Sequence, residues 1–353
     1  MVRSSLLVAF LLSSSPTPAA DRAPAPRPVH PRFELNYLPK VAGQGVLGIR
    51  PAEIARHATR AEVETASAMV FGVLAQLLGG TELDAAVWPT LADIEQCVCC
   101  LDMRITAPKS REEQGAFVIG GKTPALIRTV RPFDWDRVLR RTYPQVTAAK
   151  HAGRTYLRMP FRLPFPLSFI GSIGEPMAAY TPDEYTLVLC SESDLLPLLD
   201  RLTAGKPAPE PPPGWSEVDR DLVAFALDNR DLPLISGRFP PDYRLGRELE
   251  SLAGSAATLA VGLSASDSRT RLRFVATAKD EAAAGVLAAA LTDLFREGAA
   301  LTARAERPDP LEVFAAALLK SATLRRDGLT TTADLAADGN LVRMLLTLLR
   351  GPA

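Results

Sequence analysis

Few residues of this 353-residue chain have the types and spacing that catalysis requires. Nucleophilic catalysis needs a base beside the nucleophile, and the only histidines are His30, His57 and His151. His30 lies in a proline-rich stretch, His57 falls on a predicted helix, and His151 precedes a predicted turn. The common hydrolase and NTPase motifs do not occur in the chain. We therefore predict no catalytic, cofactor-binding or metal-binding residue.

The segment Asp134-Trp135-Asp136 holds the most suggestive pair of acids. Residues i and i+2 of a helix point in different directions, so two carboxylates at this spacing would diverge. A cap at the N-terminus of a helix explains them more simply. Carboxylates that act as a catalytic pair need no regular spacing along the chain, so a carboxylate-dependent hydrolase remains an alternative function.

The glycines of Gly43-Gln44-Gly45-Val46-Leu47-Gly48 have the spacing of a dinucleotide-binding loop. That loop needs a strand before the glycines and a helix N-terminus at the third glycine. Here Leu38-Pro39-Lys40 precedes the glycines and the apolar run follows them. We predict a loop that leads into a strand over 46–49, and no nucleotide cofactor.

Three of the four cysteines, Cys97, Cys99 and Cys100, lie in an apolar run that predicts a buried strand. Strand alternation places Cys97 and Cys99 on one face and Cys100 on the other, so the three thiols do not converge on a metal. Thiols pack as small apolar groups, and we expect buried, inert cysteines. A disulfide from Cys190 to Cys97 or Cys99 is possible only if their strands are neighbours.

Lys and Arg together number 40, as do Asp and Glu, so the net charge is zero. This balance argues against a broad affinity for nucleic acid or anionic lipid. Residues 1–20 have the three parts of a secretory signal peptide, with Arg3, an apolar run over 6–12 and small residues at Ala19 and Ala20. The run is too short to span a membrane. We predict an exported protein with no membrane span after cleavage; the alternative is a disordered cytosolic tail.

Proline content divides the rest of the chain. Residues 21–32 predict an extended, proline-rich tether. Residues 204–214 contain five prolines, which neither continue a helix nor donate to a sheet. We expect a proline-rich linker there, between a first domain over 33–203 and a second domain over 215–353.

Apolar periodicity predicts similar orders of elements in the two halves. In the first half, strands are expected at 46–49, 94–103, 115–119, 155–158 and 186–190, with helices at 50–78, 133–141 and 191–202. In the second half, strands are expected at 222–227, 258–263 and 271–278, with helices at 244–253, 281–296, 311–319 and 340–349, and a hairpin around Asp327-Gly328.

The predicted fold class is α+β. Short connections between the strands favour mainly antiparallel sheets with helices packed on one face. We interpret the order of elements as two tandem α+β repeats, with two unrelated α+β domains as the alternative. The segment 159–170, with three Phe and three Pro, is the best candidate for an interaction segment.

The first half resembles a broad group of exported proteins of planctomycete-type bacteria. The resemblance is carried by four short motifs, over 33–39, 48–53, 132–136 and 180–188. It implies an exported α+β protein without an established activity and provides no catalytic residues. We predict an exported, non-enzymatic protein that binds another protein or a polymer in the cell envelope.

Overall fold

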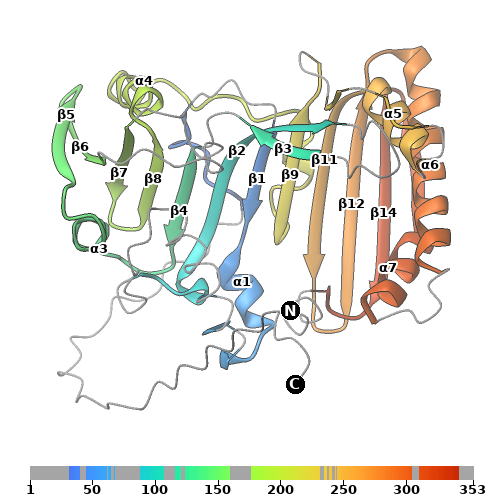
Figure 1. Ribbon diagram of the computed structural model, residues 1–353, viewed down its shortest axis with the longest axis horizontal. Helices are drawn as coiled ribbons and strands as arrows, with labels where there is room; N and C mark the ends of the chain where they lie inside the picture. The colour runs from blue at the N-terminus through green and yellow to red at the C-terminus, as the bar shows by residue number, and fades with distance from the viewer. Residues whose placement is uncertain are drawn as a thin grey trace, which may run out of the picture.

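The computed structural model defines a fold of the α+β class in which one large, mainly antiparallel sheet runs through both halves of the chain (Figure 1). The described residues are 32–39, 45–61, 63–64, 67, 88–106, 116–120, 124–159, 176–230, 234–236, 238–240, 243, 245–303 and 310–341.

The strands follow the order β13-β14-β12-β11-β9-β1-β2-β4-β8-β7-β6-β5, and β3 and β10 pair with β2 off this path. Their bounds in the first half are β1 Gly45–Ile49, β2 Ile94–Thr106, β3 Ala116–Gly120, β4 Ala125–Thr129, β5 Thr147–His151, β6 Arg154–Met159, β7 Met177–Asp183 and β8 Thr186–Ser191. In the second half they are β9 Val223–Asp228, β10 Ile235–Ser236, β11 Ala256–Ala265, β12 Arg269–Ala278, β13 Thr323–Asp327 and β14 Thr330–Asp338.

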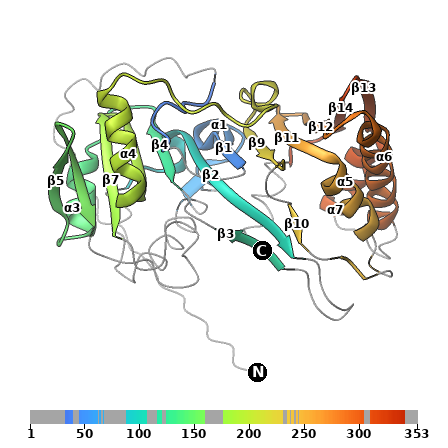
Figure 2. The same cartoon turned by 90° about the horizontal axis from the view of Figure 1, so that it is seen from above.

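The helices lie on both sides of this sheet. They are α1 Pro51–Arg56, α3 Trp135–Thr142, α4 Glu192–Thr203, α5 Gly246–Ser255, α6 Glu281–Thr302 and α7 Pro310–Lys320, with short 3₁₀ turns η1 Leu91–Asp93 and η3 Trp215–Glu217. Figure 2 shows α5, α6 and α7 gathered at one end of the sheet and α3 and α4 at the other.

One face of the sheet, here called the helix face, packs against α3 at one end and against α5, α6 and α7 at the other. Trp135 of α3 packs on Leu187, and Leu287 and Phe295 of α6 pack on Leu335. The other face, here called the opposite face, is covered by α4 and, near the middle, by the segment 33–38 and η3. Strand alternation produces both cores because successive side chains point to opposite faces.

The two halves meet at the middle of the sheet, where β1 pairs antiparallel with β9. The sequence predicted a sheet for each half, and the structure joins the two edge to edge. From this junction outward, β9-β11-β12-β14-β13 has the same order as β1-β2-β4-β8-β7. The shared order is compatible with a duplication, which remains a prediction. The linker forms no helix or strand, and its prolines at 209 and 211–213 line a hollow together with Val46 of β1.

Most predicted elements are present within one to several residues of their expected bounds. The structure adds strands that periodicity missed, among them β4, β5 and β7. The prediction of one continuous helix over 50–78 was wrong, because α1 ends at Arg56 and a turn follows over 57–59. The signal peptide, almost all of the tether, the segment 160–170, residues 62, 65–66 and 68–78, and the C-terminal helix beyond Leu341 lie outside the described residues.

A buried arginine connects the two halves beside the junction. Arg50 is 1% exposed, and its Nε and Nη2 each lie 3.2 Å from a backbone carbonyl, of Asp221 and Asp219 respectively. Its backbone N–H donates to the carbonyl of Leu222 at 2.9 Å, and its guanidinium lies 4.3 Å from the centre of the Phe33 ring. Burial lowers the pKa of Arg50 from its usual value, while neighbouring carboxylates oppose that shift.

We expect Arg50→Met to lower the free energy of unfolding by about 3 kcal/mol, because two buried carbonyls lose charged donors. Denaturant unfolding of the purified chain measures this loss. The matched control is Arg56→Met, at an exposed residue of α1, which we expect to change stability by less than about 0.5 kcal/mol. Equal losses in both variants would show that Arg50 does not connect the halves.

The turn between β5 and β6 contains the predicted Ala152-Gly153 pair, with φ of 49° and 77°. Two-residue hairpin turns with positive φ at both residues favour Asn-Gly, because Asn adopts this conformation more readily than Ala. We expect Ala152→Asn to stabilise the chain by about 0.5–1 kcal/mol in denaturant unfolding. Ala148→Asn, on the exposed part of β5, is the control and should give no such gain.

Candidate functional site

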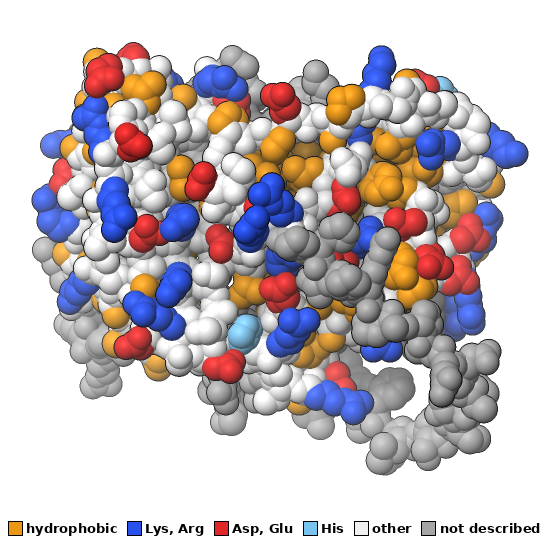
Figure 3. Space-filling model, turned by 180° about the vertical axis from the view of Figure 1, so that it is seen from behind, with side chains coloured by type: hydrophobic (Ala, Val, Ile, Leu, Met, Phe, Trp, Pro, Cys, Tyr) orange, Lys and Arg blue, Asp and Glu red, His pale blue; other side chains and the backbone are white. Residues whose placement is uncertain are grey.

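A hollow in the described part of the chain lies on the opposite face, over β11, β12 and β14. Its volume is about 610 Å³. The lining residues are Glu217, Asp221, Gly262, Ser264, Arg269, Arg271, Leu272, Arg273, Ser321, Thr323, Asp334, Leu335 and Ala336. Figure 3 shows basic and acidic side chains interspersed on this face, so the hollow lies in a surface of mixed charge.

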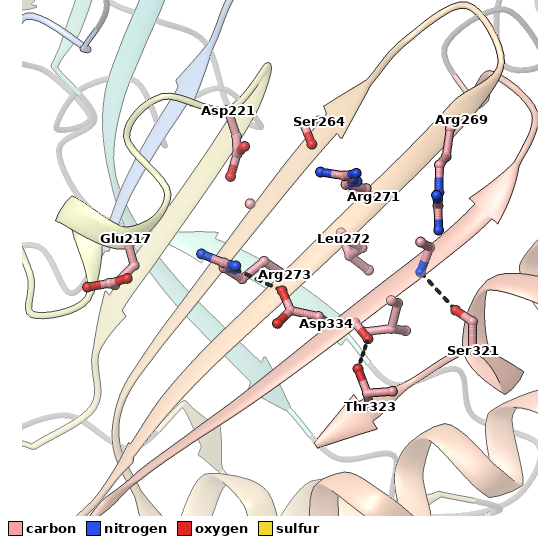
Figure 4. Close-up of a pocket in the computed structure, with 13 residues that line it drawn as sticks. Glu217, Asp221, Ser264, Arg269, Arg271, Leu272, Arg273, Ser321, Thr323 and Asp334 are labelled. Atoms are coloured by element: carbon pink, nitrogen blue, oxygen red, sulfur yellow. Dashed lines mark hydrogen bonds and ion pairs between the residues drawn. The ribbon is translucent and has the colours of Figure 1, made fainter. Parts of the chain in front are cut away.

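Strand β12 forms the floor of the hollow and brings three arginines to it, Arg269, Arg271 and Arg273 (Figure 4). They occupy alternate positions and therefore point to the same face. Leu272 and Phe274, between and after them, point to the helix face and pack with the core of α6 and α7. The same alternation that builds the core thus lines up the arginines.

The strand register decides which side chains stand beside each arginine. The residues in register across β11, β12 and β14 are Gly262, Arg273 and Asp334 in one row and Ser264, Arg271 and Ala336 in the next. Arg273 therefore has an acid as a direct neighbour, and Arg271 has only small residues.

The acids of the hollow gather around Arg273. Its Nε lies 2.9 Å from Oδ1 of Asp334, and this hydrogen bond is the main cause that raises the pKa of Arg273. The charges of Asp221 and Glu217 raise it further. This end of the hollow therefore holds three acids around one arginine.

Asp221 lies in the loop that precedes β9. Arg50 binds the backbone carbonyl of this residue, and Asp221 also lines the hollow. A Cβ at Gly262 would overlap the Asp221 carboxylate, so the glycine leaves the space in which this acid lies against β11. Burial raises the pKa of Asp221, against the opposing effect of Arg273 and Arg50. The same cause raises the pKa of Asp219, two residues earlier.

The residues that the sequence singled out lie elsewhere. Asp134 caps α3, as predicted, and its side chain accepts a hydrogen bond from the backbone N–H of Arg137 at 3.0 Å. His57 lies 3.2 Å from Asp267, and His151 lies 2.8 Å from Asp200. His30 falls outside the described residues.

The glycine run has a packing explanation. A Cβ at Gly48 would come within 2.8 Å of the Phe33 ring, and one at Gly45 within 3.1 Å of the carbonyl oxygen of Ala226. Close approach of neighbouring groups to β1 therefore requires both glycines. Gly43 and Gln44 lie outside the described residues.

Each of the four cysteines is a free thiol. Strand β2 alternates as predicted, with Cys97 opposite Ile49, Cys99 opposite Leu47 and Cys100 opposite Val46. The proposed disulfide to Cys190 required β2 and β8 to be neighbours, but β4 lies between them. Burial raises the pKa of the Cys97 thiol to about 11 and of the Cys100 thiol to about 12, so these thiols are protonated at neutral pH. The described residues contain no group of His, Cys, Asp and Glu that could hold a metal ion.

Sequence reasoning missed the hollow altogether. The alternating arginines of β12 were a visible signal, since Arg269, Arg271 and Arg273 stand in strand spacing. The approach of Asp221, however, depends on a register and a loop position that only the folded sheet provides.

No protein-family model matches the chain, and no curated protein matches it. Among solved structures, three crystal forms of TP0453, a Treponema protein, are similar to it. Forms I and IV are 10% identical, with TM-scores of 0.38 and 0.39, over 90% of this chain and 96% of that chain. Form III is 9% identical, with a TM-score of 0.39, over 90% and 98%. These values support no assignment of a site or a function.

No helix in the described part of the chain combines the length and the apolar character that crossing a membrane requires.

The raised pKa of Asp221 predicts how stability depends on pH. The folded state holds the proton more tightly than the unfolded state, so the stabilisation by this proton is present at low pH and is lost as the pH rises through the folded pKa. Relative to Asp221→Asn, the wild type should lose free energy of unfolding between about pH 3 and pH 7. Denaturant unfolding of both proteins across this range measures the difference. If the free energy of unfolding of the wild type relative to Asp221→Asn stays constant or increases as the pH rises, the burial of this carboxylate is contradicted.

Proposed function

We propose that this chain is an exported, non-enzymatic binding protein of the cell envelope, and that the hollow on the opposite face holds a segment of its partner. Export is supported by the basic, apolar and small-residue order of positions 1–20. The resemblance of the first half to exported proteins agrees with this location.

The observation that carries the proposal is a charged hollow in the sheet, in which Arg269 and Arg271 have no acidic partner among the described residues. The helix face at this end of the sheet is closed by α6 and α7, whereas the hollow on the opposite face has a lining rich in charged groups and hydroxyls. A wide, polar floor on rigid strands suits contact with an extended partner better than enclosure of a small apolar molecule. No histidine or cysteine is present among its described lining residues.

A carboxylate-dependent hydrolase is the second candidate, and one observation favours it. Asp221, with its raised pKa, and Glu217 line the same hollow. A carboxyl group with a raised pKa is a candidate general acid. Turnover of an envelope polymer that Asp221→Asn abolishes, with folding unchanged, would favour the hydrolase over the binding protein.

Filling the hollow tests the binding function. Ala336 lies half-buried on the floor, and Ala336→Trp places a large ring over β14. We expect immobilised wild-type chain to retain one reproducible component of a solubilised envelope fraction, and Ala336→Trp to retain at least about tenfold less of it. Quantitative mass spectrometry of the eluates measures the ratio.

The matched control is Ala317→Trp, at an exposed residue of α7, which packs on the helix face. We expect this variant to retain the component as the wild type does. Equal retention by all three proteins would place binding outside the hollow, and retention of nothing by the wild type would contradict the binding function itself.

A further inference from the structure

Two of the three arginines in the hollow are left without an acidic partner. Arg273 has Asp334 as its ion-pair partner. Within the described part of the chain, the side chains of Arg269 and Arg271 make neither a hydrogen bond nor an ion pair. The hollow therefore has an acidic end, where Asp334, Asp221 and Glu217 surround Arg273, and a positive end at Arg269 and Arg271.

Arg271 is the centre of the positive end. Its neighbours in register are Ser264 on β11 and Ala336 on β14, and neither brings a charge or a bulky side chain. Arg271 is exposed, and the Ser264 hydroxyl donates to no described residue. Figure 4 shows Ser264 and Arg271 side by side in the hollow. A guanidinium and a free hydroxyl together form a donor set for a carboxylate or phosphate group.

The spacing of the donors identifies the shape of the ligand. Arg269 and Arg271 are two residues apart on one strand, a separation of about 6.8 Å. An extended peptide also projects alternate side chains to one side at about this repeat. Two acids at alternate positions of an extended segment would therefore face the two arginines together.

We propose that the positive end of the hollow binds an extended acidic peptide segment of a partner protein, through carboxylates at alternate positions that pair with Arg269 and Arg271. This proposal rests on the binding function proposed above. The backbone of β12 is already paired on both sides, with β11 and β14, so the segment lies across the floor and contacts side chains. It does not add a strand to the sheet.

The lining favours a peptide over an acidic polysaccharide. Sugar rings usually pack on aromatic side chains, and the described residues that line this hollow include no Phe, Tyr or Trp. Planar, two-pronged guanidinium groups match carboxylates of any source, however, so an acidic polysaccharide belongs in the test.

The test is direct binding of defined probes to the full chain, by fluorescence anisotropy at low ionic strength. The first probe is a labelled peptide with Glu at alternate positions among Ala, and the second carries the same number of Glu in one consecutive block. Labelled polygalacturonate is the third probe. We expect the alternating peptide to bind most tightly, and Arg271→Gln to weaken its binding about tenfold.

The matched control is Arg325→Gln, which removes the same charge from an exposed residue of the neighbouring edge strand β13, outside the hollow. We expect this variant to bind the alternating peptide within about twofold of the wild type after a salt correction. Circular dichroism and thermal unfolding of each variant establish that it is folded, and Arg271→Lys provides a second reading at the same position with the charge kept.

Three outcomes would overturn the proposal. The first is an equal loss of affinity for the alternating peptide in Arg271→Gln and Arg325→Gln, which indicates non-specific charge attraction. The second is equal binding of the two peptides. The third is tighter binding of polygalacturonate than of either peptide. If the wild type retains an envelope component that Ala336→Trp loses but Arg271→Gln keeps, the acidic peptide is wrong and the binding function stands. If the wild type retains no component, the binding function fails instead.

Discussion

Strand β1 is hydrogen-bonded on both sides, to β2 of its own half and to β9 of the other half, and the arrangement of the chain depends on this pairing. A five-residue strand is a short junction for a sheet of this width, so other contacts must hold it. Arg50 follows the strand directly and binds two carbonyls of the second half, 169 and 171 residues away in sequence. The contact with Asp219 is buried and the contact with Asp221 is partly buried, and a charged donor contributes more to stability there than at the surface.

The junction also positions the hollow. Arg50 binds the carbonyl of Asp221, and the side chain of the same residue lies against Gly262 on the hollow's edge. Arg50 therefore acts on the acid of the site both through the backbone and through its charge, and Arg273 acts on the same carboxylate from the floor. The connection between halves and the electrostatics of the site share one loop, over 219–222.

The parts of the fold that sequence predicts are those in which local pattern and tertiary packing agree. The cap at Asp134, the alternation through Cys97 to Cys100 and the hairpin at Asp327-Gly328 are all local features. Strand β4 is five residues buried between two neighbours, β5 is short and polar, and β7 carries two alanines and a proline, so none shows strong strand propensity. Pairing with neighbouring strands of the sheet stabilises these three strands, although their own residues have no strong strand propensity. The hollow was missed for the same reason, since its residues meet only through register.

The hollow exists because of which residues occupy the opposite face, and not because a helix happens to be absent. At the corresponding place in the first half, Leu126 of β4 and Val188 of β8 are fully buried in the cores formed with the segment 33–38 and with α4. In the second half, β12 and β14 present Arg273 and Asp334 in the same row across the sheet. Covering these groups with an apolar helix would cost several kcal/mol for each charge removed from water. The charges that disfavour an apolar cover on this face also suit a charged partner. A ligand with its own acids forms ion pairs that offset the free energy of desolvation, and an apolar helix forms none.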